Sequence, residues 1–168
     1  MEKKRVVNKQ NNSSYCLVCG LKNSFGLFTR FYETEEKELV GLATGRDEHQ
    51  GYPGRMHGGI ITALLDETVG RTVMIHDPKT FGVTAEISVR FKKPVPLEEE
   101  LKIVGRIDRD NGRVFHGSGE LVLQDGTVAA TARGKFFKMH IDSIVEEGES
   151  FEEEHWFLEE GEDDPEVV

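Results

Sequence analysis

The chain has 168 residues, of which 37% are hydrophobic and 31% are charged, a balance typical of one soluble globular domain with short extensions. No apolar run is long enough to span a bilayer. The charged residues 1–5 are not followed by an apolar segment, so a secretory signal is not expected. Cys16 and Cys19 are too few for a disulfide framework. We therefore expect a cytoplasmic protein.

The net charge of -10 comes from one segment of the sequence. Residues 146–168 contain 12 of the 31 acidic residues and no Lys or Arg, so the rest of the chain carries 21 basic against 19 acidic residues. An acidic segment of this kind repels phosphates, which argues against nucleic-acid binding. A local basic site for a phosphorylated ligand on the remaining chain stays compatible with the composition.

The composition predicts three parts. Residues 1–14 are polar and basic, and we expect them to be disordered or loosely attached. Residues 15–140 carry the hydrophobic patterns of a folded domain. Residues 141–168 form an acidic tail, which we expect to be a docked short helix, a partner-binding element or a solvated segment. Solvation alone does not explain its aromatic cluster, which comprises Phe151, His155, Trp156, Phe157 and Leu158.

A hairpin opens the domain. Residues 16–26 are rich in turn formers, and residues 27–32 and 38–44 alternate as two strands. Residues 45–56 then form a loop rich in glycine.

The next stretch changes its period. Apolar residues from Ile60 to Val73 recur at three- and four-residue spacing, which predicts a helix with one broad buried face. The helix is expected to begin near Gly58 or Gly59 and to end near His76, because a proline follows. Gly70 weakens a helix relative to alanine, which favours a role in close packing against a strand or a second helix.

Strands dominate the rest of the domain. Alternating residues and two glycine turns predict four more strands, at 81–91, 101–108, 114–123 and 127–139. Six strands and one helix make an α+β domain, in which a curled antiparallel sheet surrounds one long central helix. The open edges and the second face of the sheet need cover, so we expect a homodimer or homotetramer.

The start of the helix contains the residues suited to chemistry. Gly58 and Gly59 would present backbone amides that lack partners within the helix, and such amides can bind an oxygen that gains negative charge. Asp66 falls about two turns further along, on an otherwise apolar side, where a carboxylate needs a partner or a purpose. Glu67 lies about 100° further round the helix and should face elsewhere.

Each of these residues also has a purely structural interpretation. The glycines suit a simple turn from loop to helix. Asp66 suits an exposed position paired with Arg71 or Lys79, and His57 suits a hydrogen bond to a carbonyl group. The combination is harder to explain without a function than any one residue.

His57-Gly58-Gly59, followed by Asp66, resembles the His-Gly-Gly…Asp motif of the hotdog-fold thioesterases, and within them the phenylacetate-pathway (PaaI-like) branch. Weaker matches extend the resemblance from about residue 16 to residue 139: Cys16-Leu17-Val18-Cys19-Gly20, Thr84 to Phe91 with Pro94, and Ala132 to Phe136. The resemblance implies a hotdog fold and an acyl-CoA thioesterase that acts on a small aryl- or medium-chain acyl-CoA.

The resemblance also implies residue roles. Asp66 would attack the thioester carbonyl or activate a water that does so, and the Gly58 amide would polarise the carbonyl oxygen next to His57. Thr84 matches a hydroxyl that the partner subunit contributes to orient the water or the carboxylate. Gln50 matches a polar residue that contacts the thioester.

Coenzyme A would enter as part of the substrate, and no separate cofactor is expected. Because CoA is anionic, we expect Arg90, Lys92 and Lys93 to flank its groove, with Gly59 also in contact. Lysines on a strand edge are common without any ligand. Further basic candidates are Arg55, Arg133 and Lys135.

The Cys16–Cys19 pair offers two ligands, whereas a structural zinc site usually has four. We therefore expect reduced thiols in a turn and no metal. Pooling of ligands from two subunits, or participation of His49 and His57, is the alternative.

Three other functions fit parts of the pattern. The same fold can serve as a non-catalytic acyl-CoA or acyl-carrier binding module. A dehydratase is less compatible, because such relatives use a catalytic histidine on a different helix motif. A partner-binding protein would act through the acidic tail. The apolar residues that suit either an acyl site or a plain core are Ile61, Leu64, Leu65, Phe81 and Val83.

Overall fold

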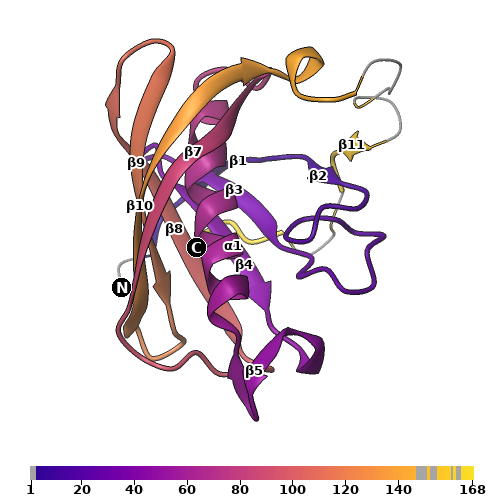
Figure 1. Cartoon of the computed structure of the whole chain (residues 1–168), viewed down its shortest axis with the longest axis vertical. Helices are drawn as coiled ribbons and strands as arrows, with labels where there is room; N and C mark the ends of the chain where they lie inside the picture. Colours follow the sequence, from indigo (N-terminus) through magenta and orange to yellow (C-terminus); the bar gives the residue numbers. More distant parts are fainter. Residues whose placement is uncertain (1–2, 147–150, 152–154, 160, 162–163) are drawn as a thin grey trace.

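The computed structural model describes residues 3–146, 151, 155–159, 161 and 164–168. Seven strands form one antiparallel sheet in the order β1-β3-β4-β8-β9-β10-β7, and the helix α1 (Gly58–Gly70) lies across one face of it (Figure 1). The strands of this sheet are β1 (Val6–Lys9), β3 (Arg30–Thr34), β4 (Leu39–Thr44), β7 (Thr80–Phe91), β8 (Glu100–Asp110), β9 (Val114–Val122) and β10 (Val128–His140).

Two small sheets and three short 3-10 helices complete the described structure. β2 (Asn12–Ser13) pairs with β11 (Trp156–Phe157), and β5 (Gln50–Tyr52) pairs with β6 (Arg55–Met56). The 3-10 helices are η1 (Asp47–His49), η2 (Arg71–Ile75) and η3 (Ile141–Ser143).

The predicted α+β architecture is confirmed. The six strands expected from the alternation correspond to β3, β4, β7, β8, β9 and β10, and the central helix begins at Gly58 as expected. The helix ends earlier than predicted. After Gly70 the backbone tightens into η2, where the Arg71 amide is shared between the carbonyls of Glu67 and Val69.

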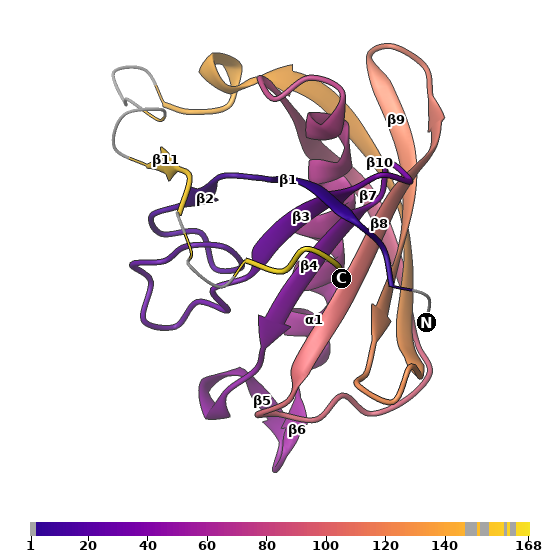
Figure 2. The same ribbon diagram turned by 180° about the vertical axis from the view of Figure 1, so that it is seen from behind.

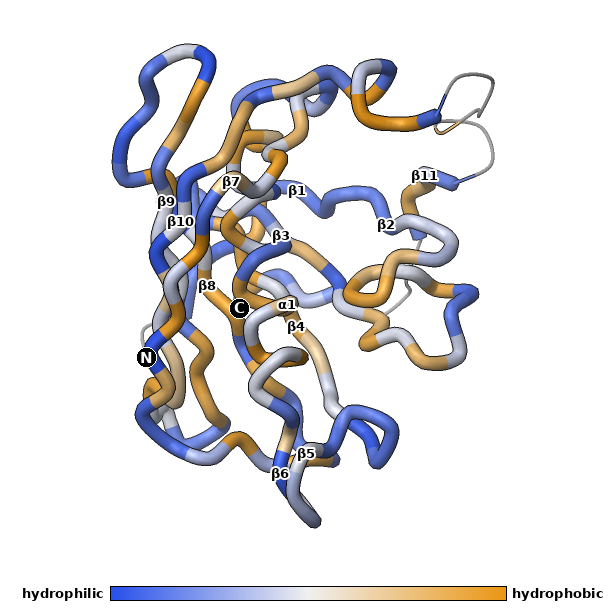
Figure 3. Tube along the Cα trace, in the orientation of Figure 1, coloured by the Kyte–Doolittle hydropathy of each residue, from blue (hydrophilic) through white to orange (hydrophobic). Residues whose placement is uncertain are grey.

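The structure differs from the expectation for residues 1–14. Val6–Lys9 form β1, an edge strand that pairs with β3. Lys4 and Val168 exchange two backbone hydrogen bonds of 2.8 Å each, which join the segment before β1 to the last residues. β1 has only four residues, Val-Val-Asn-Lys, and the residues that follow it towards β2 are hydrophilic (Figure 3), so the hydrophobic pattern did not reveal it.

The core lies between α1 and the sheet. Leu64, Leu65 and Val69 of the helix are fully buried. Gly70 and Gly82 bring α1 and β7 into backbone contact, because a Cβ atom on Gly82 would lie 2.4 Å from the Gly70 carbonyl oxygen. The predicted packing role of Gly70 is therefore confirmed.

The last residues of the chain cross β3 and β4 on the face opposite α1 (Figure 2). Asp164 accepts hydrogen bonds from Lys9 Nζ at 2.8 Å and from the Tyr32 hydroxyl at 2.8 Å, and Glu159 pairs with Arg30 at 2.6 Å. The acidic tail thus binds basic residues of its own domain. Residues 147–150, 152–154, 160 and 162–163 of the tail lie outside the described residues. Within the segment expected as a short helix, Trp156–Phe157 form the strand β11 instead.

β7 forms one edge of the seven-stranded sheet, because β10 is its only neighbour there. Thr84, Ala85 and Glu86 at the middle of β7 are exposed. In the described part of the chain, no helix combines the length and the apolar character required to cross a membrane.

Candidate functional site

Asp66 and Thr84 form a pair between α1 and β7. The Thr84 hydroxyl donates a hydrogen bond of 2.7 Å to Asp66 Oδ1. The structure therefore brings together two residues that the sequence proposed for one site. The resemblance implied a hydroxyl from the partner subunit, but this contact lies within one chain. The alternative pairing of Asp66 with Arg71 is not formed, because Arg71 pairs with Glu67 instead.

The environment of Asp66 raises the pKa of its carboxyl group. Burial is the main cause, and the negative charge of Glu67 adds to it, while the hydrogen bond from Thr84 acts in the opposite direction. Burial raises the pKa because the charged form loses water. A carboxylate with a raised pKa is a stronger base, so Asp66 is better suited to accept a proton than an ordinary Asp.

The helix N-terminus has one free amide. His57 is the N-cap of α1, and its Nδ1 atom accepts a 2.8 Å hydrogen bond from the Gly59 amide. The expectation that both glycine amides are free is therefore wrong, because capping by the preceding side chain satisfies the second one. The Gly58 amide forms no hydrogen bond with any described residue. His57 thus has a clear structural role.

A groove of about 540 Å³ surrounds Gly58. Lys92, Lys93 and Arg55 line it, as does the exposed ring of Phe91. Gln50 lies on β5 with an exposed side chain and does not line this groove, although its neighbour Gly51 does. Two of the three basic residues expected to flank CoA are therefore next to the free amide.

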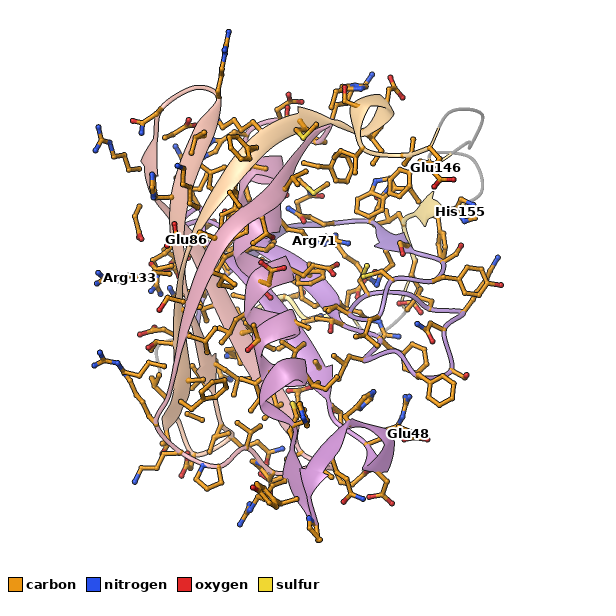
Figure 4. All side chains as sticks on the ribbon, in the orientation of Figure 1. Glu48, Arg71, Glu86, Arg133, Glu146 and His155 are labelled. Atoms are coloured by element: carbon orange, nitrogen blue, oxygen red, sulfur yellow. The ribbon has the colours of Figure 1, made fainter. Side chains whose placement is uncertain are left out.

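Arg90 lies elsewhere. It lines a polar groove on the outer face of the sheet with Arg133, which projects away from α1 (Figure 4). Alternation along β7 explains the difference, because residues 90 and 91 point to opposite faces of the sheet. Lys92 lines both grooves.

A second cavity, of about 320 Å³, opens at Asp66. Thr84, Glu67 and Cys16 share its polar part with Asp66. Glu67 was expected to face away from Asp66. Its carboxylate does bind other groups, Arg71 and Cys16, but the residue lines the same cavity as Asp66. The apolar wall is formed by Met74, Phe81, Ile141, Ile144, Phe151 and Trp156. Of the apolar residues proposed from the sequence, Ile61, Leu64 and Leu65 belong to the core and only Phe81 lines this cavity.

A cluster centred on Arg71 lies beside this cavity (Figure 4). The guanidinium group donates to Glu67 Oε1 at 3.0 Å and to Cys19 Sγ at 2.9 Å, and it stacks on the Trp156 ring at 4.7 Å. Cys16 Sγ lies 2.9 Å from Glu67 Oε2. No prediction from the sequence covered this cluster. The four-residue spacing of Glu67 and Arg71, which suits an ion pair on a helix, was the available signal.

The cluster does not fit a metal ion. The sulfur atoms of Cys16 and Cys19 and one Glu67 oxygen lie within 4.8 Å of one another. Arg71, whose side chain is 7% exposed, already donates to two of these three groups. A hydrogen bond from Cys16 and the charge of Arg71 lower the pKa of Cys19 despite its burial. A cation at this position would face a buried guanidinium group.

Gly58 and Asp66 lie eight residues apart on one helix, which separates them by about 12 Å along its axis. A single carbonyl group cannot contact both within one chain. Both face the edge strand β7, since Gly58 lies next to Phe91 and Asp66 bonds to Thr84. The Gly58 amide and the Asp66–Thr84 pair are therefore the two halves of the candidate site, and they lie at different positions along the open edge of β7.

A curled antiparallel sheet around one central helix defines a protein of the hotdog-fold class. Residues 53–130, a little under half of the chain, match the family model of the thioesterase superfamily.

Three known proteins illustrate the similarity. Acyl-coenzyme A thioesterase THEM4 of Bos taurus is 27% identical over 143 residues, which cover 83% of this chain and 57% of the relative. The chain thus spans little more than half the length of that relative. A crystal structure of a thioesterase superfamily protein has 30% identity and a TM-score of 0.66, and the match covers 73% of this chain and 59% of that one.

The PaaI protein of E. coli, from the phenylacetic acid degradation operon, has 18% identity and a TM-score of 0.61, and the match covers 67% of this chain and 80% of PaaI. At this identity the likeness concerns the fold. The predicted resemblance to the hotdog-fold thioesterases is confirmed, and PaaI is among the proteins that share the fold.

Proposed function

We propose that this chain is an acyl-CoA thioesterase that hydrolyses a small aryl- or medium-chain acyl-CoA to the free acid and CoA. The observation that carries the proposal is the Asp66 carboxylate, which Thr84 holds at the mouth of a mostly apolar cavity. The name of the Bos taurus relative supports the same class of reaction. The cytoplasmic location remains a prediction.

In the proposed reaction, Asp66 accepts a proton from water while the water oxygen attacks the thioester carbonyl carbon. The carbonyl oxygen gains negative charge and accepts a hydrogen bond from the Gly58 amide, whose position at the start of α1 favours an anion. The tetrahedral intermediate then expels the CoA thiolate, which takes up a proton. Direct attack by the carboxylate, followed by hydrolysis of the resulting anhydride, uses the same residues.

The distance between Gly58 and Asp66 requires two copies of the chain in this mechanism. In a twofold dimer, the β7 strands of the two subunits can pair antiparallel at their open edges. The two α1 helices are then antiparallel as well, so the N-terminus of each helix lies beside the C-terminal half of the other. Asp66 with Thr84 from one subunit would then face Gly58 of the other. We propose a dimer as the smallest active unit.

The groove at Gly58 suits the CoA part of the substrate. Lys92, Lys93 and Arg55 give it positive charge, which complements the phosphates of CoA. Gly59 supports this groove through its bond to His57.

The first test measures free-thiol release from a panel of acyl-CoA substrates by the wild type and by Asp66→Asn. We expect turnover by the wild type and a loss of about 10²–10⁴-fold in the variant, the usual contribution of a general base. Asp66→Asn should be at least as stable as the wild type at neutral pH. Above the raised pKa the buried carboxylate is charged and destabilises the folded state, and the neutral amide removes this cost. Equal rates would contradict the mechanism, and acyl-CoA binding without turnover would identify a binding module.

A second test addresses the two-copy site. Gly58→Pro removes only the amide donor, since proline is tolerated at the first helical position and His57 has the extended backbone that precedes proline well. Gly58→Ala keeps the donor and serves as the control. Gly58→Pro should lose about 10²–10³-fold in kcat.

Mixing and re-assembling inactive Asp66→Asn with inactive Gly58→Pro should restore about a quarter of the wild-type rate, because half of the mixed dimers are heterodimers with one intact site. No recovery in confirmed heterodimers would place the whole site within one chain.

A further inference from the structure

The cavity at Asp66 is lined by a group of polar residues and by a larger apolar surface. From Thr84 the cavity follows β7 back to Phe81, about 10 Å away at the usual strand rise. On the helix side it extends past Gly70 to Met74. The charged groups next to it are paired with one another, because Arg71 bonds to Glu67 and stacks on Trp156.

The floor of this cavity is closed. α1 and β7 touch at Gly70 and Gly82, where a Cβ atom would lie 2.4 Å from backbone. A group that enters beside Asp66 therefore cannot slip between helix and strand into the core. Such a group has to stay on the outer side of the Gly70–Gly82 contact, between this contact and the residues that cover the cavity.

Residues of the C-terminal tail provide that cover. Phe151 and Trp156 line the cavity and stack on each other with ring centroids 5.2 Å apart. Both contact the Phe81 ring edge to face, at 5.7 Å and 5.4 Å. The pairing of β11 with β2 and the stacking on Arg71 hold Trp156 in this position. We name Phe81, Phe151 and Trp156 the aromatic wall.

We propose that the aromatic wall closes the acyl-binding site and that the tail selects acyl groups with an uncharged, apolar end of medium length, either alkyl or arylalkyl. This inference rests on the proposed thioesterase function. Phe81 and Phe151 carry no polar side-chain atom, and the indole N–H of Trp156 offers a single donor. A terminal carboxylate or hydroxyl group would therefore lose most of its hydration with little compensation. Trp156 and Phe151 are thus specificity-determining residues outside the catalytic pair.

The test compares kcat/KM for acetyl-, octanoyl-, palmitoyl-, phenylacetyl- and glutaryl-CoA in the wild type and in Phe151→Ala. The wild type should prefer octanoyl- or phenylacetyl-CoA. The ratio of kcat/KM for these two substrates shows whether the site favours an alkyl or an arylalkyl group. Phe151→Ala should raise the palmitoyl-to-octanoyl ratio about tenfold or more, the range that methylene groups command in an apolar pocket. Trp156→Phe, a milder change, should shift the ratio in the same direction.

Phe157→Ala is the matched control. Phe157 is an aromatic residue of the same short strand, but it does not line the cavity, so its variant should keep the wild-type ranking. The same ranking in Phe151→Ala as in the wild type, with turnover intact, would overturn the aromatic wall and leave the thioesterase proposal standing.

A binding measurement separates the two proposals when no substrate is turned over. Trp156 is the only tryptophan of the chain, so its fluorescence reports on the aromatic wall directly. Octanoyl-CoA should change this fluorescence saturably in Asp66→Asn, while CoA alone should not. Absence of any change with octanoyl-CoA would overturn the acyl site, whatever the catalytic result.

Discussion

Thr84 opposes the effect of burial on Asp66. The hydrogen bond from its hydroxyl lowers the pKa of a carboxyl group that burial raises. Because a base acts only when deprotonated, the acid limb of kcat/KM should lie above the ordinary Asp range. Thr84→Val removes the lowering contribution, so the limb should move to higher pH and the loss of activity should be larger in acid than in base.

The pH–rate profile of Thr84→Ser provides the control, since serine keeps the hydroxyl and should return the limb toward its wild-type position. A limb that stays in place in Thr84→Val would show that the hydroxyl does not act through Asp66.

Arg71 is the buried cation of the described structure with the most partners. Its guanidinium group lies between the rings of Phe31 and Trp156, at 4.4 Å and 4.7 Å, and bonds to Glu67 and to the Asn11 carbonyl. Arg71→Ala would leave Glu67 without its counter-charge, so we expect a loss of about 3–5 kcal/mol in the free energy of unfolding.

Arg133→Ala is the comparison for urea unfolding. Arg133 is exposed on the outer face of the sheet (Figure 4), and its loss should change the free energy by about 0.5 kcal/mol or less. Similar losses for the two variants would show that the cluster around Arg71 is not a stabilising unit.

The contact between α1 and β7 determines where the helix sits. Gly82→Ala would place a methyl group against the Gly70 carbonyl oxygen and within 2.9 Å of the Phe115 ring. Since backbone has to move, we expect a loss of about 1–3 kcal/mol. In Gly58→Ala, by contrast, the methyl group meets Phe91 at an ordinary 3.5 Å. Thermal unfolding compares the two, and a fully stable Gly82→Ala would mean that α1 can shift along the sheet.

The sequence predicted the elements whose packing produces a pattern. Strands β7 to β10 alternate because one face covers α1, and the helix repeats at three- and four-residue spacing because one side is buried. The strand β1 was not predicted, because it pairs with β3 and with tail residues that are distant in sequence, and a local hydrophobic pattern does not reflect such pairing. The 3-10 end of the helix depends on tertiary contacts in the same way.

The candidate site was predictable in part. The motif from His57 to Asp66 pointed to the free Gly58 amide and to the carboxylate, and the resemblance added Thr84. Arg90, Lys92 and Lys93 are distributed over two faces of the sheet, which depends on the alternation along β7. The positions of Phe151 and Trp156 depend on contacts with residues distant in sequence, such as the pairing of β11 with β2. Neither is encoded in residues near the motif.

Ion pairs and hydrogen bonds attach the acidic tail to the domain. The bond from Arg30 lowers the pKa of Glu159, and for Asp164 the bonds from Lys9 and Tyr32 outweigh the opposing effect of burial. Groups with a lowered pKa stabilise the folded state above their unfolded pKa and lose this effect as the pH falls through the folded value. The tail should therefore stay docked at neutral pH and detach only in strong acid.

Trp156 fluorescence during acid titration measures this detachment. Combining Asp164→Asn with Glu159→Gln should weaken docking of the tail already at neutral pH and flatten the acid transition, because the two carboxylates whose protonation drives it are absent. An unchanged transition would mean that the aromatic contacts alone hold the tail.

The pairing of Lys4 with Val168 sets an order of events during biosynthesis. β1 leaves the ribosome early and can join β3 soon after it, whereas Val168 becomes available only after every residue between them has been made. The outer edge at the start of β1 therefore stays uncovered until Val168 has been made. Its lysine and asparagine side chains make an uncovered edge a poor template for other nascent chains. Asn8 and Lys9 thus lower the risk of aggregation while this edge is uncovered.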